Sequence, residues 1–311
     1  MIKEERVIIS TDINIGATIA YQDKEQKRPL VLLIMGTGSL DRDGNGFGFK
    51  SNMYKELSNI FVEMGYVCIR YDKRGTHEST GNAKTSGLSD LVTDAASVIN
   101  YAKKLDCVDE NKIVVCGHSE GAMIATLLTK TEDLQGIILL SGACTSLKDA
   151  MLYQNHLVVE QAEDMKGILG WFLRKTLNKQ DIEKQVSALY EKAEHTTKPT
   201  YFYRGTLLST KYMKEHNALT SDDYVSLLKE YKGKTLAITG QSDVQADYRM
   251  LESISDVEGV TIFTPERVNH VLRDVDAESN ILDIKREYKL SFKKPISQRI
   301  KDSISDWSSK L

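Results

Sequence analysis

Six short apolar runs, in which polar and apolar residues do not alternate, constrain the fold of this chain more than any other feature of its sequence. They lie at residues 30–34, 66–70, 113–116, 137–140, 235–238 and 260–263. A strand with one face in water alternates apolar and polar residues, whereas a strand covered on both faces does not. The runs therefore predict the central strands of a parallel sheet with helices on both faces.

The segments between these runs have the 3.6-residue periodicity of amphipathic helices. Apolar residues recur on one face of residues 57–64, 91–102 and 123–128, and again at residues 296–307. Two further strands, at residues 7–9 and 13–20, are predicted to form a hairpin that leads into the sheet. Alternating strands and helices indicate the α/β class with a doubly wound, mostly parallel sheet.

One long interval interrupts this alternation. Between residues 145 and 232 only amphipathic helical patterns occur, without a convincing buried strand. An interval of this length inside an α/β series is predicted to be an inserted helical cap. The chain would then consist of a first core part (1–144), the cap (145–232) and a second core part (233–311).

Composition narrows the class of partner. The formal net charge of −3 gives no basic excess for binding nucleic acid or an anionic membrane. The longest apolar run is far shorter than the roughly 20 residues that span a bilayer. The first residues are charged and lack the apolar stretch of a signal peptide. The four cysteines show no metal-binding spacing. We expect a cytoplasmic protein without cofactor, nucleic-acid partner or membrane insertion; the oligomeric state stays open.

The strand at 113–116 is followed directly by the sequence GHSEG, which has the G-x-S-x-G pattern. Between a buried strand and a helix, this pattern is typical of a nucleophile elbow, a turn so tight that residues near the serine must be small. Gly117, Gly121 and Ala122 meet that requirement. The sequence therefore predicts that Ser119 is a nucleophile at the carboxyl edge of the sheet.

A serine hydroxyl needs a base to take its proton and an acid to orient that base. In folds with a nucleophile elbow, the acid follows the nucleophile in the chain and the histidine base comes last, each on a loop after a strand. Asp243 follows the strand at 235–238, and His270 follows the strand at 260–263. Because ligands bind beyond the carboxyl ends of such strands, both residues are predicted to lie near Ser119.

Other residues could replace these two. Asp247 lies one helical turn beyond Asp243 and is the alternative acid; Asp149, shortly after the strand at 137–140, is a weaker one. His118 is next to the serine in sequence, but neighbouring residues in such a turn point in different directions. We interpret His118 as a packing residue of the elbow rather than the base.

The oxyanion of an acyl-transfer intermediate requires two preorganised hydrogen-bond donors. One is predicted to be the backbone N–H of Glu120, the residue after the nucleophile. The second should come from the loop after the strand at 30–34, and we assign it to the backbone N–H of Thr37, with Gly38 as the alternative.

These motifs resemble the α/β-hydrolase superfamily, and within it a group of bacterial serine esterases related to dienelactone hydrolases and prolyl-oligopeptidase-type domains. Residues 35–39 (MGTGS) with 41–44 (DRDG) are similar to the HGSG…DRDG loop of that group, and residues 70–75 (RYDKRG) to its R-x-D-x-R-G turn. Residues 240–243 and 269–270 match its acid and histidine loops. Met35 replaces the histidine that usually precedes the first glycine, a position that orders the oxyanion loop.

The resemblance implies hydrolysis of small or short-acyl carboxylic esters through an acyl-enzyme. Thioesterase, peptidase and acyltransferase activities use the same residues, and a non-catalytic ligand receptor with this fold is a further alternative. Aromatic residues of the cap could line an acyl pocket or pack the cap's own core, and we favour packing: Tyr153, Trp171, Phe172 and residues 201–203.

Overall fold

A central sheet organises the molecule in the computed structural model, which describes residues 1–311 except the side chain of Leu169. The described residues form an eight-stranded sheet in the order β1-β2-β4-β3-β5-β6-β9-β10. The strands are β1 (Lys3–Ser10), β2 (Asn14–Tyr21), β3 (Arg28–Ile34), β4 (Val67–Tyr71), β5 (Val108–His118), β6 (Gly136–Leu140), β9 (Lys234–Ile238) and β10 (Val260–Phe263). Each of the predicted runs overlaps one of these strands.

The sheet is parallel from β4 to β10, and β1 and β2 add an antiparallel hairpin at one edge. Consecutive residues of β3 face opposite sides, and both sides are buried. Leu30, Leu32 and Ile34 pack in one apolar cluster, while Val31 and Leu33 pack in another. The absence of alternation in these runs is thus explained by helices on both faces, and the predicted doubly wound α/β fold is confirmed.

One cluster is covered by α2 (Leu88–Ala102), α3 (Glu120–Leu128) and α8 (Ser221–Glu230), with the 3₁₀ helix η1 (Tyr248–Ile254) beside them. The other cluster is covered by α1 (Met53–Glu63) and α10 (Gln298–Ser308). A 3₁₀ turn, η2 (Ile281–Asp283), and α9 (Ile284–Ser291) follow β10 in the chain.

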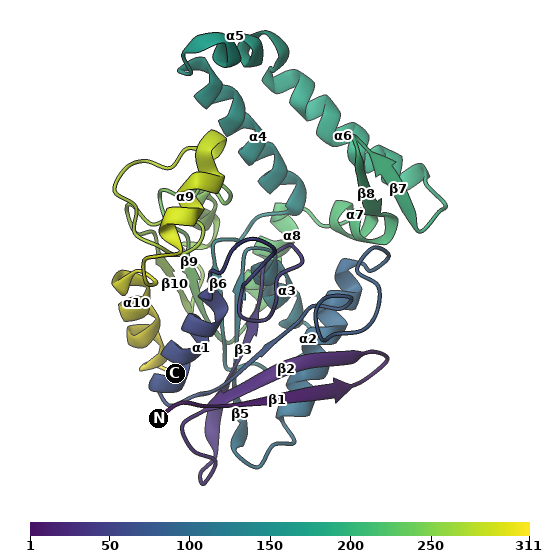
Figure 1. Cartoon of the computed structure of the whole chain (residues 1–311). Coiled ribbons are helices and arrows are strands. Elements are labelled where there is room, and N and C mark those ends of the chain that lie inside the picture. The colour runs from purple at the N-terminus through teal and green to yellow at the C-terminus, as the bar shows by residue number, and fades with distance from the viewer.

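The interval after β6 rises above the carboxyl edge of the sheet as an arch (Figure 1). It contains α4 (Leu147–Glu163), α5 (Gly167–Thr176), α6 (Lys179–His195), a hairpin of β7 (Thr200–Tyr203) and β8 (Thr206–Ser209), and α7 (Thr210–Asn217). The sequence predicted a wholly helical interval and did not reveal this hairpin. Its short strands pair only with each other, so they leave no buried apolar run in the sequence.

Helix α8 falls inside the predicted cap interval but packs elsewhere. Val225 and Leu228 belong to the apolar cluster under the sheet, whereas the interval has a small cluster of its own around Leu189 and Tyr190. We propose that the cap comprises α4 to α7 and ends before Ser221, with α8 as a core helix. Among the described residues, no helix combines the length and apolarity needed to cross a membrane.

Candidate active site

Ser119 lies at the turn between β5 and α3 with a strained backbone, at φ 55° and ψ −122°. The turn leaves no space for side chains around it. A Cβ added at Gly117 would lie 2.0 Å from the carbonyl oxygen of Gly121, and one added at Gly121 would lie 2.1 Å from that of Ile34. A non-glycine residue with positive φ is costly and tends to occur at functional positions. The strain therefore holds the Ser119 side chain at the edge of the sheet.

Asp243 and His270 form a buried hydrogen-bonded pair at the same edge. The Nδ1 atom of His270 lies 2.9 Å from Oδ2 and 3.0 Å from Oδ1 of Asp243. The Asp243 carboxylate also accepts hydrogen bonds from the backbone N–H groups of Gln245 and Ala246, at 2.8 and 2.9 Å. These contacts fix the imidazole with Nδ1 toward the carboxylate, which leaves its Nε2 atom as the nitrogen that is not engaged by Asp243.

The two alternative acids are used in other contacts. Asp247 caps η1 and pairs with Arg249 through two hydrogen bonds of 2.8 Å. Asp149 lies in the first turn of α4 and accepts hydrogen bonds from the hydroxyls of Ser146 and Ser221, at 2.8 and 2.5 Å. Of the three carboxylates, Asp243 is the one that contacts His270.

A cavity of about 470 Å³ lies between the sheet edge and the cap, and both Ser119 and His270 line it. Thr37 and Glu120, whose backbone N–H groups are the predicted oxyanion donors, line it as well, whereas Gly38 does not. Neither N–H donates a backbone hydrogen bond among the described residues. The walls are mainly apolar and come from both core and cap, including Met123, Leu147, Met151, Val271 and Phe292.

The aromatic residues considered for an acyl pocket lie outside this cavity. Trp171 and Phe172 are 54% exposed on α5, and Phe202 is 61% exposed on β7. Tyr201 packs in the cap's own cluster. Tyr153 donates a hydrogen bond of 3.1 Å to the backbone carbonyl of Asp243 and thereby links α4 to the acid loop. From the cap, the cavity is lined instead by Leu147, Ala150, Met151 and Gln154 of α4.

His118, the other histidine at the elbow, connects two loops of the site. Its Nε2 faces the backbone carbonyl of His270 at 2.8 Å, and its Nδ1 faces the hydroxyl of Tyr54 at 3.0 Å. The Tyr54 oxygen accepts the N–H of Gly36 at 2.9 Å. Burial, reinforced by the neighbouring His270, lowers the pKa of His118 to about 3. His118 is therefore neutral: it donates from Nε2 and accepts from Tyr54 at Nδ1, so both ring nitrogens are engaged by other groups.

A buried ionic cluster surrounds the carboxylate of Glu120, the residue after Ser119. The Lys73 ammonium donates to the carboxylate of Glu120 and, at 2.8 Å, to the carbonyl oxygen of Gly36. Tyr212 of α7 also donates to the Glu120 carboxylate, and His216 Nε2 lies 3.7 Å from it. Burial alone would raise the pKa of Glu120, but the charge of Lys73 and the hydrogen bonds from Lys73 and Tyr212 outweigh it and lower the pKa. Glu120 is therefore ionised.

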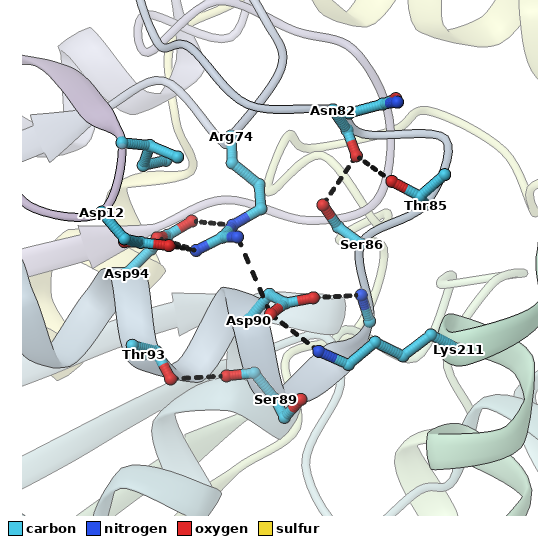
Figure 2. Close-up of polar contacts among 12 residues, drawn as sticks. Asp12, Arg74, Asn82, Thr85, Ser86, Ser89, Asp90, Thr93, Asp94 and Lys211 are labelled. Atoms are coloured by element: carbon cyan, nitrogen blue, oxygen red, sulfur yellow. Dashed lines mark hydrogen bonds and ion pairs between the residues drawn. The ribbon is translucent and has the colours of Figure 1, made fainter. Parts of the chain in front are cut away.

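Helix α7 is also tied to the N-terminus of α2 by exposed and half-buried contacts. Lys211 lies 2.8 Å from Asp90, which also faces Arg74, as Figure 2 shows. Glu215 accepts hydrogen bonds from the N–H and hydroxyl of Ser89, at 2.8 and 2.7 Å. We call α7 with these contacts the foot of the cap. It connects the cap to the core close to the candidate site.

Comparison with known proteins identifies the family to which the chain belongs. A family model described as Serine aminopeptidase, S33, a group of hydrolases, matches residues 44–256, about two thirds of the chain. The chain belongs to this family. The matched region contains the elbow and Asp243, and ends before the loop that carries His270.

Individual relatives of this hydrolase are distant. Esterase EstD of Thermotoga maritima is 21% identical over 283 residues, which are 90% of this chain and 61% of EstD. The chain thus spans less than two thirds of the length of that relative. Among solved structures, Est1E of Butyrivibrio proteoclasticus has a TM-score of 0.57 at 17% identity and covers 98% of this chain and 99% of its own. The Pyrococcus furiosus esterase Pf2001 has a TM-score of 0.56 at 12% identity, covering 98% and 91%. These structures share the fold.

Sequence reasoning missed four side chains around the site of this hydrolase: Tyr54, Lys73, Tyr212 and His216. Lys73 carried a signal, because a charged residue directly after a buried strand lies at the carboxyl edge. Tyr212 and His216 are one helical turn apart on α7, and nothing in their spacing indicates that they meet Glu120. Among the described residues, no group of three or more His, Cys, Asp or Glu side chains is arranged to hold a metal ion.

Proposed function

We propose that this chain is a serine hydrolase that cleaves carboxylic esters with small or short acyl groups through an acyl-enzyme on Ser119. The observation that carries the proposal is the Asp243–His270 pair, whose imidazole lines the same cavity as the strained Ser119. The similarity to EstD, an esterase, supports the choice of reaction. A cavity of about 470 Å³ with mainly apolar walls suits a small uncharged ester.

In this mechanism His270 Nε2 takes the proton of Ser119 as the hydroxyl attacks the ester carbonyl. Asp243 holds the imidazole in the required tautomer and stabilises its charged form. The oxyanion binds the backbone N–H groups of Thr37 and Glu120, and the latter stands at the N-terminus of α3, where the helix dipole favours negative charge. His270 then protonates the leaving alcohol and activates the water that releases the acid.

The lining of the cavity favours an ester over the N-terminus of a peptide. An aminopeptidase must bind the α-ammonium group of its substrate, which requires an acidic partner or a comparable acceptor set. Among the described lining residues, Glu120 is the one acidic side chain, and its carboxylate is engaged by Lys73 and Tyr212. We therefore infer that aminoacyl p-nitroanilides are poor substrates.

Hydrolysis of p-nitrophenyl acetate and butyrate by the purified protein tests the proposal. Ser119→Ala should remove the activity and the labelling by a fluorophosphonate probe, because each needs the activated hydroxyl. Ser141→Ala is the matched control, since Ser141 lines the same cavity without contacting the Asp243–His270 pair. Activity that survives in Ser119→Ala would reject this nucleophile, and a wild-type protein that neither labels nor hydrolyses would favour a ligand receptor.

A cytoplasmic location is part of the proposal. It is supported by four free cysteines, Cys68, Cys107, Cys116 and Cys144, all of which are buried. Unpaired thiols are usual where the medium is reducing. Fractionation of cells that produce the protein would test it, and recovery in the medium or an extracytoplasmic fraction would contradict it.

A further inference from the structure

Lys73 stands in the site without a role in the proposed proton transfers. Its side chain is 8% exposed, and its ammonium contacts two groups, the carbonyl oxygen of Gly36 and the carboxylate of Glu120. The Gly36 carbonyl is part of the peptide that carries the Thr37 N–H, and the carboxylate is the side chain of Glu120. Thr37 and Glu120 are the two residues with the predicted oxyanion donors. We propose that Lys73 is a positioning residue that orients both donors through its single ammonium group. This inference rests on the proposed function.

The first donor is oriented through the peptide that joins Gly36 to Thr37. The described residues contain no cis peptide bond. In a planar trans peptide the carbonyl of one residue and the N–H of the next point in opposite directions. Lys73 holds the Gly36 carbonyl at 2.8 Å, and this contact fixes the Thr37 N–H on the opposite side of the peptide. The hydrogen bond to an ammonium also polarises the peptide, which makes its N–H a stronger donor.

The neighbouring peptide is held as well, so the loop cannot rotate as a unit. The Gly36 N–H donates to the Tyr54 hydroxyl at 2.9 Å, and Tyr54 is buried under the loop. The loop also lies directly against the elbow, because a Cβ added at Gly36 would be 2.8 Å from the Cβ of Ser119. Tyr54 and Lys73 thus order the loop from two sides. They provide the anchoring that the histidine expected at the position of Met35 would supply in the group that the sequence resembles.

The second donor is oriented through the Glu120 side chain. Glu120 is the first residue of α3 and follows the strained Ser119 directly. The buried carboxylate receives Lys73 and Tyr212, so that the residue is held at both its backbone and its side chain. Because the same ammonium binds Glu120 and Gly36, it couples the positions of the two donors. Loss of the ammonium would allow the distance between the two N–H groups to change.

A buried ion pair could instead serve stability alone, and the next residue in the chain provides the comparison. Arg74 forms two hydrogen bonds of 2.7 and 2.6 Å with Asp94 of α2, and both side chains are buried. Figure 2 shows this pair beside the foot of the cap. Neither residue contacts the Gly36 loop or Glu120. Arg74→Met is therefore a matched control for the loss of a buried cation from this turn.

The experiment compares Lys73→Met, Arg74→Met and the double variant Lys73→Met/Glu120→Gln. With p-nitrophenyl butyrate, Lys73→Met should lower kcat about 10- to 100-fold, up to the loss that follows removal of one oxyanion donor. The KM should change little, because the contact acts on the transition state. The affinity for a trifluoromethyl ketone, which forms a tetrahedral adduct with serine, should fall by a similar factor.

Thermal stability separates positioning from packing. Lys73→Met leaves the Glu120 carboxylate buried without its cation, so its Tm should fall, as should that of Arg74→Met. The double variant removes that unpaired charge and should recover Tm while its kcat stays low. Arg74→Met should keep kcat within about threefold of wild type. Recovery of kcat together with Tm in the double variant, or an equal loss of kcat in Arg74→Met, would overturn the inference. A wild-type protein without Ser119-dependent hydrolysis would refute the proposed function itself.

Discussion

The carboxyl edge of the sheet and the cap line one cavity but are stabilised differently. At the edge, buried polar groups hold one another, as in the contacts of Asp243 with His270 and of Lys73 with Glu120. The cap has a small apolar cluster and large apolar side chains in water, with Ile168 87% exposed and Trp171 54% exposed. Its polar ties to the core come from the foot and from α4, where Tyr153 and Gln154 donate to the backbone carbonyls of Asp243 and Gln245, and they are absent from the described exposed side chains at the tip.

This difference indicates that the edge of the sheet contributes to the reaction and that the cap contributes to the shape of the cavity. Reaction chemistry needs groups fixed to within a fraction of an ångström, and buried, mutually satisfied polar groups on strand ends provide that order. A cap that shapes a cavity needs less order. We therefore expect substitutions at the edge to have large effects on turnover, and expect the effects in the cap to decrease from the foot to the tip at α5.

The largest effect in this comparison is expected for Asp243→Asn. The amide keeps the size of the side chain but cannot hold the His270 tautomer that presents an unprotonated Nε2 to Ser119. The kcat should fall by about 10⁴-fold, as expected for the loss of the acid of a triad. Asp247→Asn is the matched control, because Asp247 pairs with Arg249, and its activity should remain near that of wild type. A reversed order of the two variants in the p-nitrophenyl butyrate assay would make Asp247 the acid.

A second effect at the edge concerns stability in acid. The pKa of His118 is lowered from the ordinary 6.5 to about 3 in the folded chain, so below pH 6.5 the unfolded chain binds a proton that the folded chain does not. The free energy of unfolding therefore falls as the pH decreases from about 6.5 toward 3, by up to about 1.4 kcal/mol per pH unit from this residue. Above pH 6.5 the contribution is constant.

Chemical denaturation between pH 4 and 8 measures this dependence. Below pH 6.5, His118→Gln should reduce the slope of the unfolding free energy against pH by up to about 1.4 kcal/mol per pH unit, the effect of one proton. The substitution also removes the contact with Tyr54. His195→Gln in the cap is the control for the loss of an imidazole, because that side chain is exposed on α6. Equal slopes in wild type and His118→Gln would show that the buried imidazole is not the group that titrates.

The positions of the central strands along the chain and the geometry of the elbow could be predicted because their causes are local. Burial on both faces is recorded in each run, and Gly117 and Gly121 are required by contacts within a few residues of the turn. The positions of Asp243 and His270 followed from their strands, since parallel strands bring their carboxyl ends to one edge. Their roles in catalysis remain proposals.

Other side-chain contacts between distant segments could not be predicted. Lys73, Glu120 and Tyr212 are far apart in sequence, and only the folded topology brings them together. The apolar face of α8 has the same periodicity whether its partner is the cap or the core, so the pattern of Tyr224, Leu227 and Leu228 did not reveal that the helix packs against the sheet. Exposed aromatic residues of α5 likewise cannot be distinguished by pattern from residues of a pocket.

The smallest effects separate the foot of the cap from its tip. Tyr212→Phe removes one hydrogen bond to the ionised Glu120 but leaves Lys73 and the contact of Lys211 with Asp90. A hydrogen bond to a charged group contributes about 2 kcal/mol, so we expect a modest loss of stability and a decrease in kcat/KM of about two- to tenfold. Trp171→Ala, in the exposed tip, should change kcat/KM less than about twofold, because Trp171 does not line the cavity. A larger decrease in kcat/KM for Trp171→Ala than for Tyr212→Phe would mean that the tip of the cap, rather than its foot, affects the active site.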